Sequence, residues 1–160
     1  MSSSFQTFKK LVESPLKFGM FLFTKLPSAF FSGVRVISLE EEYCEVSIPY
    51  KWFSQNPFRS TYFACLGMAA ELSTGALAMA HLYKKNPAVS MLVVKSESEF
   101  FKKAIAKTIF RCEDGNTIKQ TINEAIATKE AKTVTAKCIG KNLNGDIVAV
   151  FSFTWSFKAK

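Results

Sequence analysis

The pattern of hydrophobic and polar positions in the first half of the chain predicts two short strands and then one long helix. Residues 34–39 and 43–50 are β-type runs on either side of the acidic turn 40–42, which we expect to be solvated. Residues 60–85 contain no proline, are apolar nearly all the way round a helix, and run into Asn86-Pro87, a good stop signal. A helix of this composition must be buried on most of its sides.

The second half of the chain predicts four strands and a short helix. In order along the sequence, the runs are 89–101, 104–113, the helical 115–128, 132–141 and 147–157. Asn144-Gly145 separates the last two runs and is a strong hairpin turn. The last run alternates, with one face formed by Ile147, Ala149, Phe151, Phe153, Trp155 and Phe157. A curved antiparallel sheet wrapped around the long central helix would bury that helix, which predicts an α+β fold.

The N-terminal segment 1–32 predicts amphipathic helices that precede a single domain over 33–160. Residues 5–12 and 16–31 have helical patterns, broken near Pro15 and Pro27. The Phe- and Leu-rich stretch is interrupted and shorter than the ~20 residues that span a bilayer, and no signal-peptide cleavage site follows it. We expect these helices to pack on the domain or on a partner subunit, with contact to a membrane surface as the alternative.

Composition narrows the classes of partner and site. The net charge of +8 favours anionic partners such as nucleic acid, an acidic membrane or the phosphates of coenzyme A. The basic residues are spread along the chain and no RNA-binding or zinc-finger motif occurs, so we expect no nucleic-acid partner. Four separated cysteines without metal spacing indicate a reduced, cytoplasmic protein, and a single histidine, His81, gives no histidine-based metal site. Sixteen phenylalanines supply apolar surface for a core, an acyl pocket or a subunit interface.

Glu71 is the residue that least fits the long apolar helix. A carboxylate there is costly unless it is paired, solvated or protonated. Gly67 and Gly75 lie four residues before and after it, and Thr74 flanks the same stripe, so a strand or a ligand must come close. In one interpretation Glu71 is a general base or nucleophile in a cleft. In the other, the helix packs tightly on the sheet and Glu71 is ion-paired, for example with Arg59.

The segment from Asn56-Pro-Phe-Arg-Ser-Thr-Tyr-Phe-Ala to Glu71, together with the order of elements, resembles the hotdog-fold thioesterases. It is most similar to the phenylacetate-degradation type and a related branch of hotdog domains of unknown function. In the active enzymes an Asn precedes a His-Gly-Gly motif by six residues, and a carboxylate follows the Asn by fifteen. Asn56 and Glu71 occupy the first and last of these positions, whereas Tyr62, Phe63 and Ala64 replace the His-Gly-Gly. The resemblance covers about residues 33–157 and implies a hotdog fold.

The resemblance also implies roles for these residues. Glu71 would activate water or attack the acyl carbonyl, and Asn56 would position the water or carbonyl across the subunit interface of a homodimer or dimer of dimers. Tyr62 and the backbone N–H groups of Phe63 or Ala64 would hold the oxyanion. The residues assigned to the acyl pocket are Trp52, Phe53, Phe58, Gly67, Thr74 and Gly75, with ordinary packing as the alternative for the three aromatic ones.

Two functions follow from the resemblance. The first is hydrolysis of an acyl-coenzyme A thioester, in which coenzyme A is part of the substrate, its phosphates meet lysines of the later strands, and no cofactor or metal is needed. The second is a non-catalytic module that binds an acyl group, a fatty acid or acyl-coenzyme A, because the His-Gly-Gly motif is replaced. Nucleic-acid binding is a third candidate that rests on charge alone.

Overall fold

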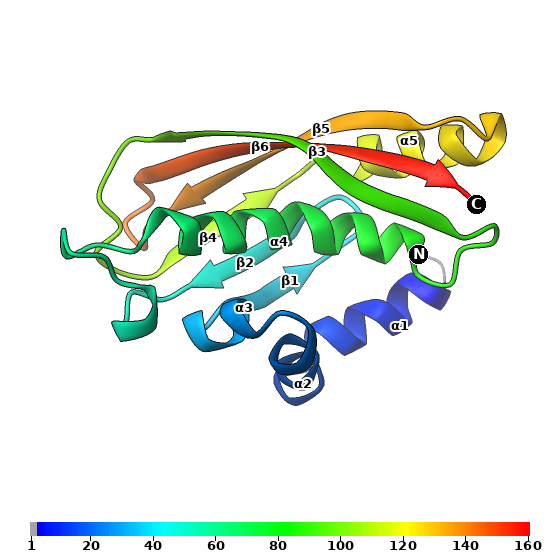
Figure 1. The fold of residues 1–160 in the computed structure, drawn as a ribbon. Coiled ribbons are helices and arrows are strands. Elements are labelled where there is room, and N and C mark those ends of the chain that lie inside the picture. The colour runs from blue at the N-terminus through cyan, green and yellow to red at the C-terminus, as the bar shows by residue number, and fades with distance from the viewer. Residues whose placement is uncertain (1–2) are drawn as a thin grey trace.

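The computed structural model describes residues 3–160, so residues 1 and 2 of the predicted N-terminal segment lie outside it. Figure 1 shows a sheet curved around one long helix, with three N-terminal helices on the other side of that helix. The elements in chain order are α1 (Ser3–Val12), α2 (Pro15–Lys25), α3 (Pro27–Ser32), β1 (Arg35–Leu39), β2 (Cys44–Ile48), the 3₁₀ helix η1 (Trp52–Ser54), α4 (Phe63–Leu82), β3 (Val89–Phe100), β4 (Thr108–Cys112), α5 (Gly115–Thr128), β5 (Lys132–Lys141) and β6 (Ile147–Ala159).

The sheet has six antiparallel strands in the order β1-β2-β4-β5-β6-β3. Its inner face is apolar because alternate residues of each strand point toward α4. Six residues of β6 were predicted to form this face. Five of them are buried, Ala149, Phe151, Phe153, Trp155 and Phe157, whereas Ile147 at the start of the strand is 43% exposed. The predicted α+β fold, with an antiparallel sheet wrapped around one central helix, is therefore confirmed.

Helix α4 is long and apolar enough to cross a membrane by length and composition, but two-thirds of that stretch is buried within the fold. This is the composition of a core helix. The helix begins at Phe63 and not at residue 60, because the preceding residues are held elsewhere. The N–H of Thr61 donates to the Ala104 carbonyl at 2.7 Å, and Arg59 adopts a left-handed φ of 58°. The same contact keeps residue 104 out of β4, which starts at Thr108.

The N-terminal segment forms three helices where the sequence predicts two. The Ser14 hydroxyl caps α2, and Pro15 and Pro27 each begin a helix, a position that suits proline because its missing N–H is not needed there. The helices pack on the domain through Phe5, Phe8, Val12, Phe18 and Leu22, all buried.

Candidate functional site

Glu71 lies partly buried on α4 and faces a small cavity between α4 and the junction of α2 and α3. The cavity has a volume of about 180 Å³ and is lined by Lys25, Leu26, Pro27, Ser28, Ala29, Met68, Glu71 and Leu72. The sequence gives no sign of this arrangement, because the junction is more than forty residues away from Glu71 along the chain. The N-terminal helices thus complete the surroundings of the carboxylate.

No cation pairs with Glu71 among the described residues, so the predicted alternative of an ion pair with Arg59 is not formed. Arg59 lies exposed in the loop before α4. Burial raises the pKa of Glu71, and no charge opposes that shift. A carboxylate with a raised pKa and no partner is suited to accept a proton near neutral pH.

Both helix glycines are explained by the approach of aromatic rings from β6. A Cβ on Gly67 would lie 3.6 Å from the Phe151 ring, and one on Gly75 would lie 3.1 Å from Glu71 Oε1 and 3.3 Å from the Trp155 ring. The Glu71 carboxylate and the Trp155 indole therefore flank the same point, and the indole gives the carboxylate an apolar wall. Gly75 keeps both in place because any larger residue would push one of them away.

Thr74, predicted to line the acyl pocket, holds the Trp155 indole in place and does not line the cavity beside Glu71. It is fully buried, and its hydroxyl accepts a hydrogen bond from Trp155 Nε1 at 3.0 Å and donates one to the Glu71 carbonyl at 3.0 Å. Thr74 therefore orients the indole beside the carboxylate, a contact that sequence spacing alone does not predict.

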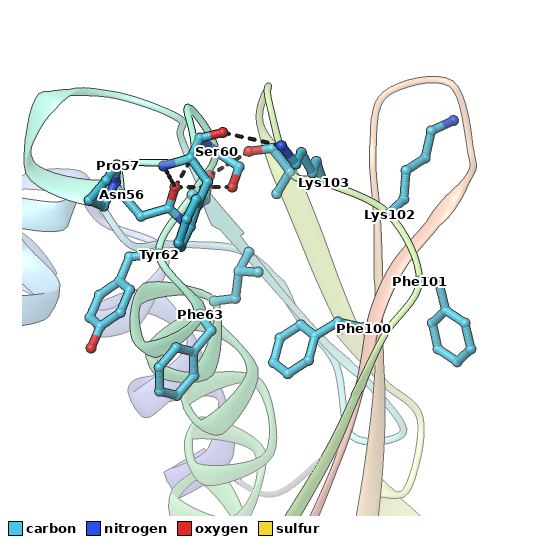
Figure 2. Close-up of a pocket in the computed structure, with 13 residues that line it drawn as sticks. Asn56, Pro57, Ser60, Tyr62, Phe63, Phe100, Phe101, Lys102 and Lys103 are labelled. Atoms are coloured by element: carbon cyan, nitrogen blue, oxygen red, sulfur yellow. Dashed lines mark hydrogen bonds between the residues drawn. The ribbon is translucent and has the colours of Figure 1, made fainter.

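A second, larger groove of about 580 Å³ lies where α4 begins, between α4 and the end of β3 (Figure 2). The predicted site residues Asn56, Phe58, Tyr62 and Phe63 line it. The other side of the groove, which was not predicted, is formed by Phe100, Phe101, Lys102, Lys103 and Ala104. The rings of Phe63 and Phe100 meet edge-on across it at 6.4 Å. The sequence feature that could have indicated this side of the groove is the run of two aromatic residues and two lysines at the end of β3.

Asn56 is a structural centre of the loop before α4. Its side-chain carbonyl accepts hydrogen bonds from the N–H groups of Phe58 and Ser60, at 3.0 and 3.2 Å, and from the Ser60 hydroxyl at 3.2 Å. Because the oxygen is committed to the loop, the NH₂ group of Asn56 is the part that can meet a ligand in the groove.

The start of α4 presents free backbone donors beside the groove. Tyr62 is the N-cap residue and makes no side-chain cap. Within residues 3–160, the N–H groups of Phe63 and Ala64 donate to no carbonyl or side chain, whereas the next two N–H groups turn back to the Tyr62 carbonyl. Unpaired N–H groups at the positive end of a helix dipole favour a developing negative charge. The oxyanion role predicted for the N–H of Phe63 or Ala64 stays a prediction.

One chain does not bring all the predicted residues together. Glu71 lies eight residues along α4 from Phe63, about 12 Å at 1.5 Å per residue. Asn56 and Tyr62 are therefore separated from Glu71 within a protomer. Trp52 and Phe53, predicted to line the acyl pocket, border neither the groove nor the cavity beside Glu71 and lie exposed on the surface.

Comparison with known proteins places this geometry in a structural class. A family model described as "Domain of unknown function (DUF4442)" matches residues 18–156. No curated protein matches the sequence. A probable thioesterase from Pseudomonas aeruginosa is 20% identical, with a TM-score of 0.76 over 92% of this chain and 97% of the other. A protein of unknown function from Chlorobaculum tepidum is 14% identical, with a TM-score of 0.79 over 99% and 100%. The PaaI protein of E. coli, from the phenylacetic acid degradation operon, is 12% identical, with a TM-score of 0.61 over 94% and 96%. The similarity confirms the predicted hotdog fold.

Proposed function

This chain belongs to the family of the domain of unknown function DUF4442, and from that premise we propose that it hydrolyses acyl thioesters with Glu71 as general base or nucleophile. The observation that carries the proposal is the pairing, on one helix, of two kinds of group that thioester hydrolysis needs. The N–H groups of Phe63 and Ala64 have no partner among residues 3–160 and lie at the start of α4, beside the groove. A carboxylate with a raised pKa, also without a partner in that range, lies further along α4.

The chemistry follows from these groups. As general base, Glu71 takes a proton from water, and the resulting hydroxide attacks the thioester carbonyl carbon. The N–H groups of Phe63 and Ala64 stabilise the oxyanion, with Tyr62 as a further donor. The C–S bond then breaks, and the thiolate leaves and takes up the proton. In the alternative route Glu71 attacks the carbonyl itself, and water hydrolyses the resulting anhydride.

We infer that the complete site forms between two subunits, because the groove and Glu71 are about 12 Å apart within one chain. Strand β3 is suited to the contact: it lies at the edge of the sheet and exposes Leu92 and Val94. An unpaired edge with apolar side chains favours addition of another strand. Two β3 strands pairing across a two-fold axis would give a homodimer, and two such dimers a tetramer.

The oligomeric state gives a direct prediction. Sedimentation equilibrium is expected to give twice or four times the mass of one chain, and Val94→Pro is expected to shift it to a single chain, because proline in β3 removes a hydrogen-bond donor and opposes pairing. The matched control is Ile37→Pro on β1, the opposite edge of the sheet, because Ile37, like Val94, is exposed and lies at a register shift. A monomeric wild type would contradict the shared site.

Further features fit coenzyme A as the thiol part of the substrate. Lys102 and Lys103 border the groove and can meet phosphates there, although Lys102 also pairs with Asp146 at 2.6 Å. Coenzyme A would enter and leave as substrate and product, and no resident cofactor is required. Acyl-coenzyme A is a cytoplasmic substrate, which agrees with the reduced cysteines predicted from the sequence.

The test is hydrolysis of a panel of short, long and aromatic acyl-coenzyme A thioesters by the full chain, followed through release of the free thiol. We expect turnover of at least one class of acyl group. No turnover across the panel by folded protein in its native oligomeric state would contradict the proposal.

That negative outcome would favour an acyl-binding module, the second candidate. The observation in its favour is the replacement of His-Gly-Gly by Tyr62, Phe63 and Ala64. The side chains of Tyr62 and Phe63 line the groove and narrow it where an acyl carbonyl would approach. This candidate predicts that mass spectrometry of the denatured protein finds a co-purified fatty acid or acyl thioester.

A further inference from the structure

Helix α2 has two apolar stripes, and the fold uses only one of them. Phe18 and Leu22 face the core and are buried. Leu16, Met20 and Phe23 follow a second stripe with the i, i+4, i+7 spacing of one helix face, and they are exposed, Leu16 to 77% and Met20 to 64%. Packing within the chain therefore does not explain the second stripe. The prediction that these helices pack on the domain holds for the Phe18 and Leu22 face of α2 and not for the opposite face.

This stripe continues onto α3 and η1 as one surface, which we call the aromatic face and define as Leu16, Met20, Phe23, Phe31, Trp52 and Phe53. The rings of Phe23 and Phe31 meet edge-on at 6.2 Å, Phe31 stacks on Phe53 at 5.5 Å, and Phe53 meets Trp52 at 4.9 Å. All six residues are exposed. A connected apolar surface of this kind on a folded chain marks a contact site.

The segments that carry the aromatic face are basic. The segments that build it, residues 14–39 and 46–70, contain no Asp or Glu, and their cations are Lys17, Lys25, Arg35, Lys51 and Arg59. Lys17 and Lys25 are exposed on α2, and Lys51 is exposed directly before Trp52. Apolar and aromatic side chains bordered by lysines, with a Trp at the boundary, match the requirements of an anionic lipid surface.

We propose that the aromatic face docks the protein on an anionic lipid bilayer, with its apolar side chains in the boundary between headgroups and acyl chains and its lysines on lipid phosphates. Lys25 and Leu26, which follow Phe23 at the end of α2, line the cavity beside Glu71. The docking does not depend on thioester hydrolysis, since it rests on the exposed side chains and charges of α2, α3 and η1.

Two other occupants fit the face less well. A second copy of the chain in a two-fold contact would bring Lys17, Lys25 and Lys51 against their own counterparts, and the segments that carry the face contain no acid to pair them. A single-stranded nucleic acid would find cations and rings, but the outward stripe of Leu16 and Met20 offers its bases neither a stacking surface nor a hydrogen bond.

The test is co-flotation of the full chain with vesicles of phosphatidylcholine alone or mixed with phosphatidylglycerol. Binding to the mixed vesicles is expected to be at least about tenfold tighter and to weaken with salt, because several lysines meet the lipid phosphates. Tryptophan emission should shift to the blue on binding. Since Trp155 is buried and Trp52 is 76% exposed, the shift should vanish in Trp52→Phe while binding persists.

Matched double variants distinguish binding through the aromatic face from non-specific binding through any exposed apolar residue. Leu16→Ser/Met20→Ser is expected to lower binding to mixed vesicles about tenfold or more, because these residues make no ring contacts and lie outside the core. Ile105→Ser/Leu143→Ser removes residues of similar exposure, 65% and 69%, elsewhere on the surface and should leave binding unchanged.

Four results would overturn the proposal: no binding of the wild type to mixed vesicles, equal losses in the two double variants, a changed native mass in Leu16→Ser/Met20→Ser, or displacement from vesicles by a single-stranded oligonucleotide at low concentration. The third would assign the face to a second copy and the fourth to nucleic acid.

Discussion

Replacing Glu71 with glutamine is expected to lower acyl-thioester turnover by about 100-fold or more and, in the same protein, to raise the melting temperature. Glutamine keeps the shape of the side chain but cannot accept the proton of water or attack a carbonyl. It also removes a buried charge that no cation compensates among the described residues. Loss of turnover combined with gain of stability distinguishes a functional carboxylate from a structural one.

The pH dependence follows from the direction of the pKa shift. The pKa of Glu71 is higher in the folded than in the unfolded chain because of burial, so its contribution to stability is most favourable below the unfolded value and falls as pH rises through the folded value. The stability gained in Glu71→Gln should therefore be present at neutral pH and shrink on acidification. Turnover by the wild type should fall on acidification through the same raised pKa, because the protonated carboxyl is no longer a base.

The control is Glu42→Gln, which replaces an exposed carboxylate in the turn between β1 and β2. It is expected to change neither turnover nor melting temperature. Unchanged turnover in Glu71→Gln would refute the assigned mechanism. A lowered melting temperature in that variant would show that the carboxylate stabilises the fold through a partner.

The fold was largely predictable because its strongest signals are local. The apolar composition of α4 required a surrounding sheet, and Asn144-Gly145 together with the alternation along β6 fixed a hairpin and its inward face. The predicted helix at 115–128 and strand at 132–141 have the boundaries of α5 and β5. The errors lie at element ends, such as residues 60–62, where a contact with Ala104 forty-three residues away competes with the helix.

The candidate site was predictable only in part. Glu71 stands out because its charge conflicts with every neighbour on the helix, and that conflict can be seen in the sequence alone. The cavity that it faces, and the groove wall at Phe100 and Lys103, depend on which loops meet in space. Local patterns carry no such information. The locations of Trp52 and Phe53 could not be predicted for the same reason, since aromatic side chains suit a pocket and an exposed contact surface equally.

Among the described glycines, Gly115 is the one at which an added methyl group, as in Gly115→Ala, is expected to lower stability most. A Cβ at this position would lie 2.0 Å from the backbone carbonyl oxygen of Glu41 and 2.8 Å from backbone atoms of Glu42. The obstacle is main chain, so no side chain can rotate to make room. The sequence shows Gly115 only as the start of a helix, because the turn that it touches lies more than seventy residues earlier.

The turn at residues 40–42 cannot move away from Gly115 without a loss of stability, because side chains of three helices bind it. Lys9 of α1 pairs with Glu40, His81 of α4 bonds the Glu41 carbonyl at 3.0 Å, and Lys119 of α5 pairs with the Glu41 carboxylate at 3.0 Å. The turn predicted to be solvated is thus a junction, and moving it to accommodate a methyl group strains all three contacts.

The cost of Gly115→Ala should therefore be roughly 3 kcal/mol, at or beyond the upper end for overpacking. For a chain of this length, that loss lowers the melting temperature by about 6–12 °C. Gly67→Ala is the matched control: it is also a helix glycine, but its Cβ would meet the Phe151 ring at an ordinary 3.6 Å. We expect it to be neutral or stabilising, since alanine favours helix over glycine. Thermal denaturation of both variants measures the difference, and equal melting temperatures would mean that the turn at 40–42 yields freely and does not join the three helices.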